Sequence, residues 1–157
     1  MVTDEEVRRA VREAINHLRR EHPPLALELV HERSTAHRLA VHLEPFFETW
    51  NVDCEYDRDG QLRKALSGIE QCGHRTTENI LPDIIVHHRL AEGRANNLLV
   101  IEIKKHVAQD VCDRMKLELL TSPTGHYRYQ LGLYININRG EFECTWFKDG
   151  ASESRGQ

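Results

Sequence analysis

The sequence predicts a single α/β domain in which a mixed central β-sheet is flanked by helices. Two stretches with helical spacing of apolar residues come first, and strand-like apolar runs follow at residues 84–88 and 98–105. A helical stretch then separates the second run from a further strand at residues 131–137. Because a strand, helix, strand passage implies a right-handed crossover between parallel strands, we expect the sheet to be mixed.

The first helix is expected at residues 4–20. Thr3 and Glu6 have the spacing of a capping box, and apolar residues follow at helical intervals. The pair Pro23-Pro24 ends this segment, because proline cannot continue a helix.

The second helix is expected at residues 32–44. Ala36 and Leu39 belong to its apolar stripe, and Pro45 ends or kinks it. Glu32 lies on the same stripe, so an acid is predicted on the side of this helix that faces the sheet.

The remainder of the chain predicts strands, one further helix and two irregular regions. Residues 57–80 lack periodicity and are expected to form a long loop. A helix is predicted at 107–120, and the polar tail at 150–157 is expected to fray. We therefore expect one domain at 1–157, with its core at about 25–148. The predicted strands are 52–56, 84–88, 98–105, 131–137 and 142–146.

Composition limits the class of protein. The 21 Lys and Arg residues against 25 Asp and Glu residues give a net charge of -4, so any phosphate-binding surface must be local. The four cysteines form no CxxC pair, and no apolar leader or membrane-spanning run is seen. Free buried thiols in a reducing cytoplasm, and no membrane partner, are therefore expected. A zinc-stabilised structural protein using Cys72 and His74 is an alternative.

Charged residues interrupt the two apolar strand runs. Glu102 and Lys104 share one face of their strand, while Ile103 points to the other. An acid in an apolar strand needs a partner or a metal, and Asp83 opens the neighbouring strand. Two converging carboxylates favour a divalent cation held by hard oxygen ligands, Mg²⁺ or Mn²⁺. With an ammonium on the same face, this set suits phosphodiester hydrolysis.

The motif Pro82-Asp83 followed by Glu102-Ile103-Lys104 resembles the signature of the PD-(D/E)xK nuclease superfamily, which has the restriction-endonuclease-like fold. The wider pattern, including "HERSTAHRLAVHL", "PDIIVHHR" and "NNLLVIEIKK", is similar to a bacterial and phage group in that superfamily. The resemblance covers residues 29–137. It implies an α/β domain in which the aspartate opens one central strand and the ExK motif lies on the next.

The resemblance also implies roles for individual residues. Asp83 and Glu102 would bind Mg²⁺ or Mn²⁺, with the Ile103 carbonyl as a third oxygen. Lys104 would orient the attacking water or act on it as a base, and Glu32 would supply an acid from the preceding helix. The activity implied is metal-dependent hydrolysis of DNA phosphodiester bonds.

Interpretations without a role in the site remain open for several acidic residues. Glu32 can be an acid stabilised at a helix N-terminus, and Glu55 can be a solvated or supporting acid. Asp113 and Lys116 lie three residues apart on the helix at 107–120, where a local ion pair is the favoured interpretation over a role in the site.

Basic residues near the motif predict how DNA is held. Local phosphate contacts, rather than net charge, would carry affinity and make it strongly dependent on salt. Cutting both strands with one site per chain would call for a homodimer. The alternative function is a non-catalytic nucleic-acid-binding or assembly subunit that retains the nuclease fold. The predicted DNA contacts are Arg33, His37, Arg38, His88, Arg89 and Lys105, with His87 and His106 beside them.

Overall fold

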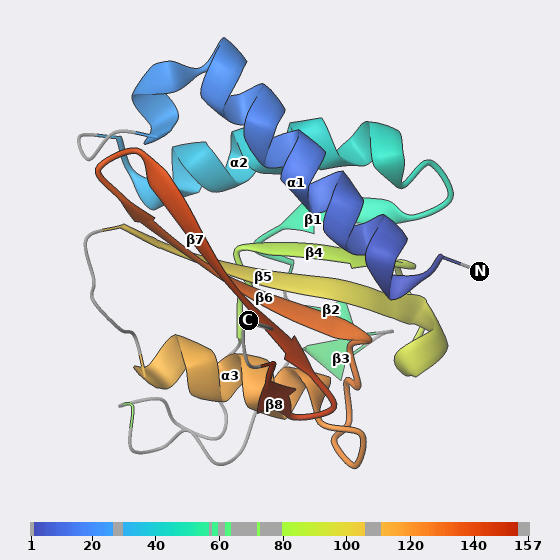
Figure 1. The fold of residues 1–157 in the computed structure, drawn as a ribbon. Helices are drawn as coiled ribbons and strands as arrows, with labels where there is room; N and C mark the ends of the chain where they lie inside the picture. Colours follow the sequence, from blue (N-terminus) through green and yellow to red (C-terminus); the bar gives the residue numbers. More distant parts are fainter. Residues whose placement is uncertain are drawn as a thin grey trace.

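The computed structural model is an α/β domain with a six-stranded mixed sheet at its centre (Figure 1). The structure describes residues 2–26, 30–56, 58–59, 62–63, 72, 80–105 and 111–153. The strand order is β1-β4-β5-β6-β7-β8, and the short strands β2 and β3 pair with each other separately. The strands are β1 (Asn51–Cys54), β2 (Arg58–Asp59), β3 (Leu62–Arg63), β4 (Ile84–His87), β5 (Asn97–Lys105), β6 (Leu131–Asn138), β7 (Glu141–Lys148) and β8 (Ala151–Ser152).

Strand directions follow from the connections. β4 pairs antiparallel with both β1 and β5, whereas β5 and β6 are parallel, with α3 (Val111–Thr121) between them in the chain. The remaining neighbours, β6 with β7 and β7 with β8, are antiparallel. The predicted crossover between parallel strands is therefore present, and the sheet is mixed as expected.

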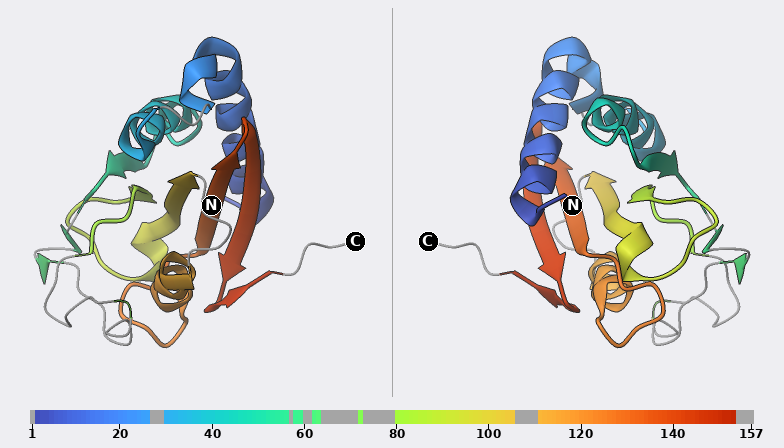
Figure 2. Two further views of the ribbon diagram at one scale, coloured as in Figure 1. Left: turned by 90° about the vertical axis from the view of Figure 1, so that its left-hand side faces the viewer. Right: turned by 90° about the vertical axis from the view of Figure 1, so that its right-hand side faces the viewer.

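Helices cover both faces of the sheet (Figures 1 and 2). On one face lie α1 (Asp4–Glu21) and α2 (Glu32–Leu43), which pack on each other, and α3 lies on the other face. Short 3-10 turns occur at η1 (Pro23–Ala26), η2 (Glu44–Phe46) and η4 (Arg94–Asn96). Two apolar clusters result, one between the sheet and α1 with α2, and one between the sheet and α3.

The alternating sides of β5 connect these two cores. Ile101 and Ile103 pack toward α1 and α2, while Val100 belongs to the cluster under α3. Gly132 on β6 permits the close approach of α3, since a Cβ there would lie 3.0 Å from Thr121 Cγ2. The helix on the α3 face is thus held close to the side of β5 from which Glu102 projects.

Helix boundaries follow the sequence signals closely. The capping box of α1 is present, because Thr3 accepts from the Glu6 backbone N–H and the Glu6 carboxylate accepts from that of Thr3. Glu32 is the first residue of α2, as expected. The predicted first turn of the third helix, at 107–110, lies outside the described residues. Among the described residues, none of the helices combines the length and apolar character that crossing a bilayer requires.

Several strand and loop predictions need correction. β1 ends at Cys54 rather than at residue 56, because Glu55 takes a left-handed backbone conformation with φ 48°. The expected loop at 57–80 contains the β2–β3 pair, and most of its other residues lie outside the described part. The tail predicted to fray at 150 instead begins with β8, which pairs with the end of β7. The residues of this segment are mostly polar, so no alternating apolar pattern indicated that its backbone pairs with β7.

The expectation of free buried thiols is wrong, because two of the four cysteines are bonded to each other and neither of the two free ones is fully buried. Cys72 and Cys112 form a disulfide, while Cys54 is exposed and Cys144 half-buried. Their separation of 40 residues gave no local spacing signal, so only the packing of residue 72 beside α3 could reveal the pair. The alternative zinc site also loses support, since the Cys72 sulfur is bonded and His74 lies outside the described residues.

The fully buried Leu39 tests the core between α2 and the sheet. Leu39→Ala is expected to lower the free energy of unfolding by about 2–5 kcal/mol, because it leaves a cavity in a closely packed interior. Urea denaturation followed by circular dichroism measures the change. Val41→Ala on the exposed side of the same helix, where the side chain is 38 % exposed, should change it by less than about 0.5 kcal/mol. Equal effects of the two substitutions would contradict this packing.

Candidate functional site

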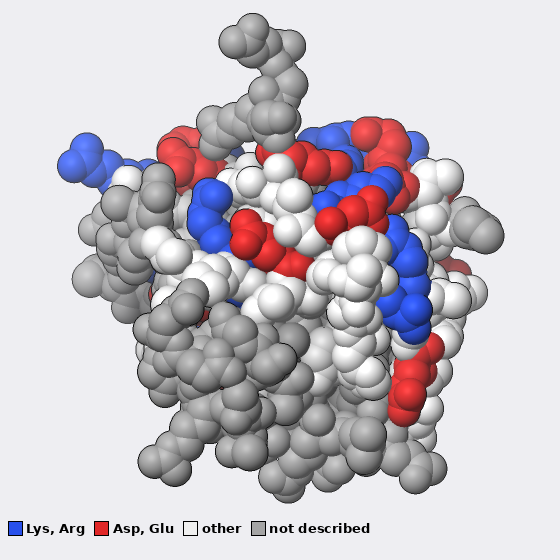
Figure 3. Space-filling view, turned by 90° about the horizontal axis from the view of Figure 1, so that it is seen from below, with Lys and Arg blue, Asp and Glu red and all other residues white. Residues whose placement is uncertain are grey.

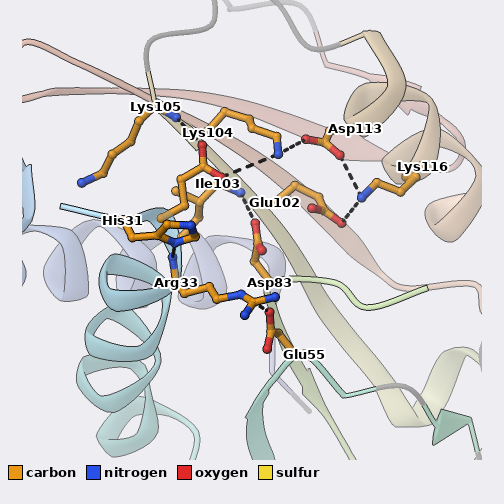
Figure 4. A network of polar contacts seen from close by, with 11 residues as sticks. His31, Arg33, Glu55, Asp83, Glu102, Ile103, Lys104, Lys105, Asp113 and Lys116 are labelled. Carbon is orange, nitrogen blue, oxygen red and sulfur yellow. Dashed lines mark hydrogen bonds and ion pairs between the residues drawn. The ribbon is translucent and has the colours of Figure 1, made fainter. Parts of the chain in front are cut away.

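Asp83, which immediately precedes β4, and Glu102 on the neighbouring β5 lie at the centre of the sheet (Figure 4). Ile84 is paired with Ile101 in antiparallel register, which places Asp83, at the entry to β4, beside Glu102 and Ile103. Asp83 Oδ2 accepts a hydrogen bond from the Ile103 backbone N–H at 2.7 Å. Glu102 is 2 % exposed. The antiparallel pairing of β4 with β5 thus brings together the two motif carboxylates, Asp83 and Glu102, from positions nineteen residues apart in the chain.

Two lysines surround the buried acids. Lys116 Nζ lies 3.1 Å from Glu102 Oε1 and 2.8 Å from Asp113 Oδ1. Lys104 Nζ lies 3.3 Å from Asp113 Oδ2. Glu102 and Lys104 therefore both contact charged groups of α3, in agreement with the predicted shared face of β5.

Glu32 reaches the site from the beginning of α2. Its Oε1 accepts from the Lys105 backbone N–H at 3.1 Å, and its Oε2 lies 3.7 Å from Lys104 Nζ. Glu32 is thus held against the end of β5 and is joined to the other acids through Lys104. The sequence interpretation that Glu32 is only a helix-terminal acid is therefore incomplete.

Burial and charge control the protonation of these groups. Burial raises the pKa of Glu102 well above its usual range, opposed by the Lys116 ammonium and reinforced by the negative charge of Asp83. Burial also raises the pKa of Asp83, although the hydrogen bond from Ile103 lowers it. For Asp113, burial is outweighed by Lys116 and Lys104, and the pKa is lowered. Asp83 and Glu102, the two acids of the motif, therefore have less compensating positive charge beside them than Asp113 has.

A divalent cation would supply the positive charge that is lacking beside Asp83 and Glu102. Four carboxyl groups and two ammonium groups are joined in the network, so full ionisation of the carboxyls would leave an excess of two negative charges. Carboxylate and carbonyl oxygens are the ligands that Mg²⁺ and Mn²⁺ prefer. Asp83, Glu102 and the Ile103 carbonyl therefore have suitable chemistry to hold one. The acids of the network are Glu32, Asp83, Glu102 and Asp113.

Asp113 and Lys116 enter the site more fully than the sequence suggested. They form the local ion pair that was favoured for them, yet the same groups also contact Lys104 and Glu102. The available signal was their position on the helix that follows the ExK strand. Their spacing of three residues alone could not show that this face of α3 lies over β5.

The predicted DNA contacts differ in whether their side chains are buried or exposed. Lys105 is 7 % exposed and its Nζ donates to the Leu25 and Val30 carbonyls at 2.7 and 2.8 Å, so this side chain does not have the exposure that the predicted phosphate contact requires. It points away from Lys104 because successive side chains of a strand alternate (Figure 4). His37 and Arg38, by contrast, are exposed on α2.

Other predicted contacts already have partners. Arg33 Nε lies 2.9 Å from Glu55 Oε1, and Arg89 forms a two-pronged ion pair with Asp53. The His88 ring stacks on Trp50 with centroids 4.0 Å apart. His87 is buried against Asp53, and His106 lies outside the described residues.

Charged side chains of both signs are interspersed on the face seen from below (Figure 3). The described part of that face is therefore not an exclusively basic surface.

The comparisons with known proteins leave the family open. No family model matches the chain, and no curated protein matches it significantly. A solved structure titled "Crystal structure of SSO0001" matches with 14 % identity over 95 % of this chain and 78 % of that chain, at a TM-score of 0.37.

The raised pKa of Glu102 predicts a pH-dependent cost of folding in the absence of metal. The unfolded chain loses this proton at a lower pH than the folded chain, so the contribution of Glu102 to stability falls as pH rises above the ordinary glutamate range. Glu102→Gln removes this titration. In EDTA, the stability of the variant relative to wild type should therefore increase between pH 4 and pH 8.

Urea denaturation at each pH measures this difference. Glu13→Gln, at an exposed position of α1, is the matched control and should show a smaller change with pH. A difference between wild type and Glu102→Gln that is constant over this range, or that moves in the opposite direction, would contradict the proposed environment of Glu102.

Proposed function

We propose that this protein is a metal-dependent nuclease of the PD-(D/E)xK type, with a restriction-endonuclease-like fold, that hydrolyses DNA phosphodiester bonds. The observation that carries the proposal is the meeting of Asp83, at the entry to β4, with Glu102 and Lys104 of β5 and with Glu32 at the end of β5. These positions agree with the motif order that the resemblance implies.

The topology adds support. The aspartate precedes one central strand, the ExK motif lies on the adjacent antiparallel strand, and a helix then leads to a parallel neighbour. The preceding helix begins with an acid that touches the same network. An arrangement that only served stability would have little need to place four buried or half-buried acids in one network.

Each residue has a role that its position allows. Asp83, Glu102 and the Ile103 carbonyl would hold Mg²⁺ or Mn²⁺, which when bound polarises a phosphoryl oxygen and lowers the pKa of a bound water. Lys104 offers an ammonium that can orient water or offset charge on the phosphate. The Glu32 carboxylate holds that ammonium in place from 3.7 Å.

Asp113 and Lys116 would act on the site indirectly. Asp113 forms ion pairs with both Lys104 and Lys116. It therefore restrains Lys104 from the α3 side, while Glu32 restrains Lys104 from the α2 side. Lys116 keeps Glu102 partly compensated before a cation arrives. We therefore regard these two as positioning residues.

The substrate would be held by exposed basic side chains near the site. His37 and Arg38 on α2 are the predicted contacts that remain exposed, while Arg33 would have to exchange Glu55 for a phosphate. A homodimer would supply the second site that cutting both strands requires. Work on intracellular DNA would take place in the cytoplasm, where reductants would act on the disulfide between Cys72 and Cys112.

A non-catalytic nucleic-acid-binding or assembly subunit is the second candidate. One observation favours it: Lys116 already provides a cationic partner to both Glu102 and Asp113. An ammonium in this position would let the fold persist without a metal.

Cleavage of DNA distinguishes these candidates. With Mg²⁺ or Mn²⁺, the wild-type protein is expected to cut plasmid or single-stranded DNA, and EDTA should stop the reaction. Glu102→Ala and Lys104→Ala should each lower the cleavage rate by about a hundredfold or more, since each removes a charged group from the reacting centre.

Lys148→Ala, a lysine paired with Asp4 away from the acidic network, is the control and should retain wild-type cleavage. Wild-type protein that cuts no form of DNA or RNA with either metal would refute the nuclease proposal. Full activity in both Glu102→Ala and Lys104→Ala would also refute it.

A further inference from the structure

The junction between α1 and the end of α2 gathers a second set of metal-binding residue types. Glu21 is the last residue of α1, His22 caps that helix, and His42 lies in the last turn of α2. Their ligand atoms all lie within 4.8 Å of one another. Packing of α1 on α2 brings them together from positions about twenty residues apart.

His42 carries a buried nitrogen that needs a partner. Its Nε2 is buried without a hydrogen-bond partner, and the side chain is 14 % exposed. The nearest carboxylate oxygen, Glu21 Oε2, is 3.9 Å away, which is beyond hydrogen-bonding distance. A neutral imidazole nitrogen in this position offers its lone pair to a metal.

Three imidazoles converge around Glu21. The ring centroids of His22 and His42 are 5.6 Å apart, and those of His17 and His42 are 5.9 Å apart. His17 Nδ1 lies 3.5 Å from Glu21 Oε1, on the same face of α1. Three histidines would repel one another if protonated together, so a surface ion pair with Glu21 explains the grouping poorly.

We propose that Glu21, His22 and His42 bind one Zn²⁺ ion. Imidazole nitrogens with one carboxylate are typical zinc ligands, whereas Mg²⁺ prefers oxygen ligands alone. Three protein ligands leave a fourth position for water, and His17 Nδ1 lies 3.5 Å from the Glu21 carboxylate, where it can help to orient this ligand. Glu21 and His22 also border a solvent-open hollow of about 600 Å³, which gives the ion a path of entry.

This zinc site is distinct from the acidic site. His42 lies ten residues after Glu32 on α2, which corresponds to about 15 Å along the helix axis. Zinc would tie the end of α1 to α2, the helix that begins with Glu32. Its effect would therefore be to fix the two helices on one another, independently of any cleavage activity.

Calorimetric titration of the metal-stripped full chain with ZnCl2 tests the site. Wild type is expected to bind one equivalent and to gain thermal stability with zinc concentration. His42→Gln, His22→Gln and Glu21→Gln should each weaken binding by about tenfold or more, because each removes a ligand. His126→Gln, at an exposed histidine after α3, is the matched control and should bind as wild type does.

Two further variants separate zinc from the acidic site. Asp83→Asn and Glu102→Gln should bind zinc with wild-type affinity; loss of binding in these variants would place the ion elsewhere and refute the proposal. Absence of zinc binding by wild type, or wild-type affinity in both His42→Gln and Glu21→Gln, would refute it as well. Glu21 is 47 % exposed in its side chain, so Glu21→Gln keeps the test available if His42→Gln does not fold.

Discussion

The burial of the Glu102 carboxylate in the middle of β5 is the constraint on which the rest of the site depends. A carboxylate at 2 % exposure cannot remain ionised without compensation, and the surrounding strands supply mostly apolar groups. Compensation comes in part from Lys116 on α3. The nearby Asp83 makes the deficit larger, because a second negative charge raises the pKa of Glu102 further. Asp83 and Glu102 are therefore incompletely compensated when both are ionised, and a divalent cation would offset their negative charge.

The fold delivers the parts of this network from separate elements. Antiparallel pairing of β4 with β5 sets Asp83 beside Glu102, and α3 brings Asp113 and Lys116 over the same side of β5. On the other side, α2 places Glu32 against the end of the strand. Lys105 anchors the segment before α2 by donating to two of its backbone carbonyls. Lys105, which the sequence predicted as a DNA contact, thus helps to position Glu32 at the start of α2.

The sequence predicted the parts of the structure that depend on local patterns. Helical spacing and the Thr3 capping box predicted α1 and α2, and apolar runs predicted β4, β5, β6 and β7. What failed depends on tertiary contacts that spacing does not encode. The disulfide of Cys72 with Cys112, the pairing of β8 and the inward course of Lys105 are of this kind. Within the site, alternation along β5 predicted the shared face of Glu102 and Lys104, but the place of α3 over it required the fold.

Calorimetric titration with Mg²⁺ tests most directly whether Asp83 and Glu102 form a divalent-cation site. Wild type and His42→Gln, which leaves the acidic network intact, are predicted to bind one Mg²⁺ ion. Asp83→Asn is predicted to lose this binding while remaining folded by circular dichroism, because it removes a ligand next to Glu102. Absence of Mg²⁺ binding by wild type, or unchanged binding by a folded Asp83→Asn variant, would contradict the account.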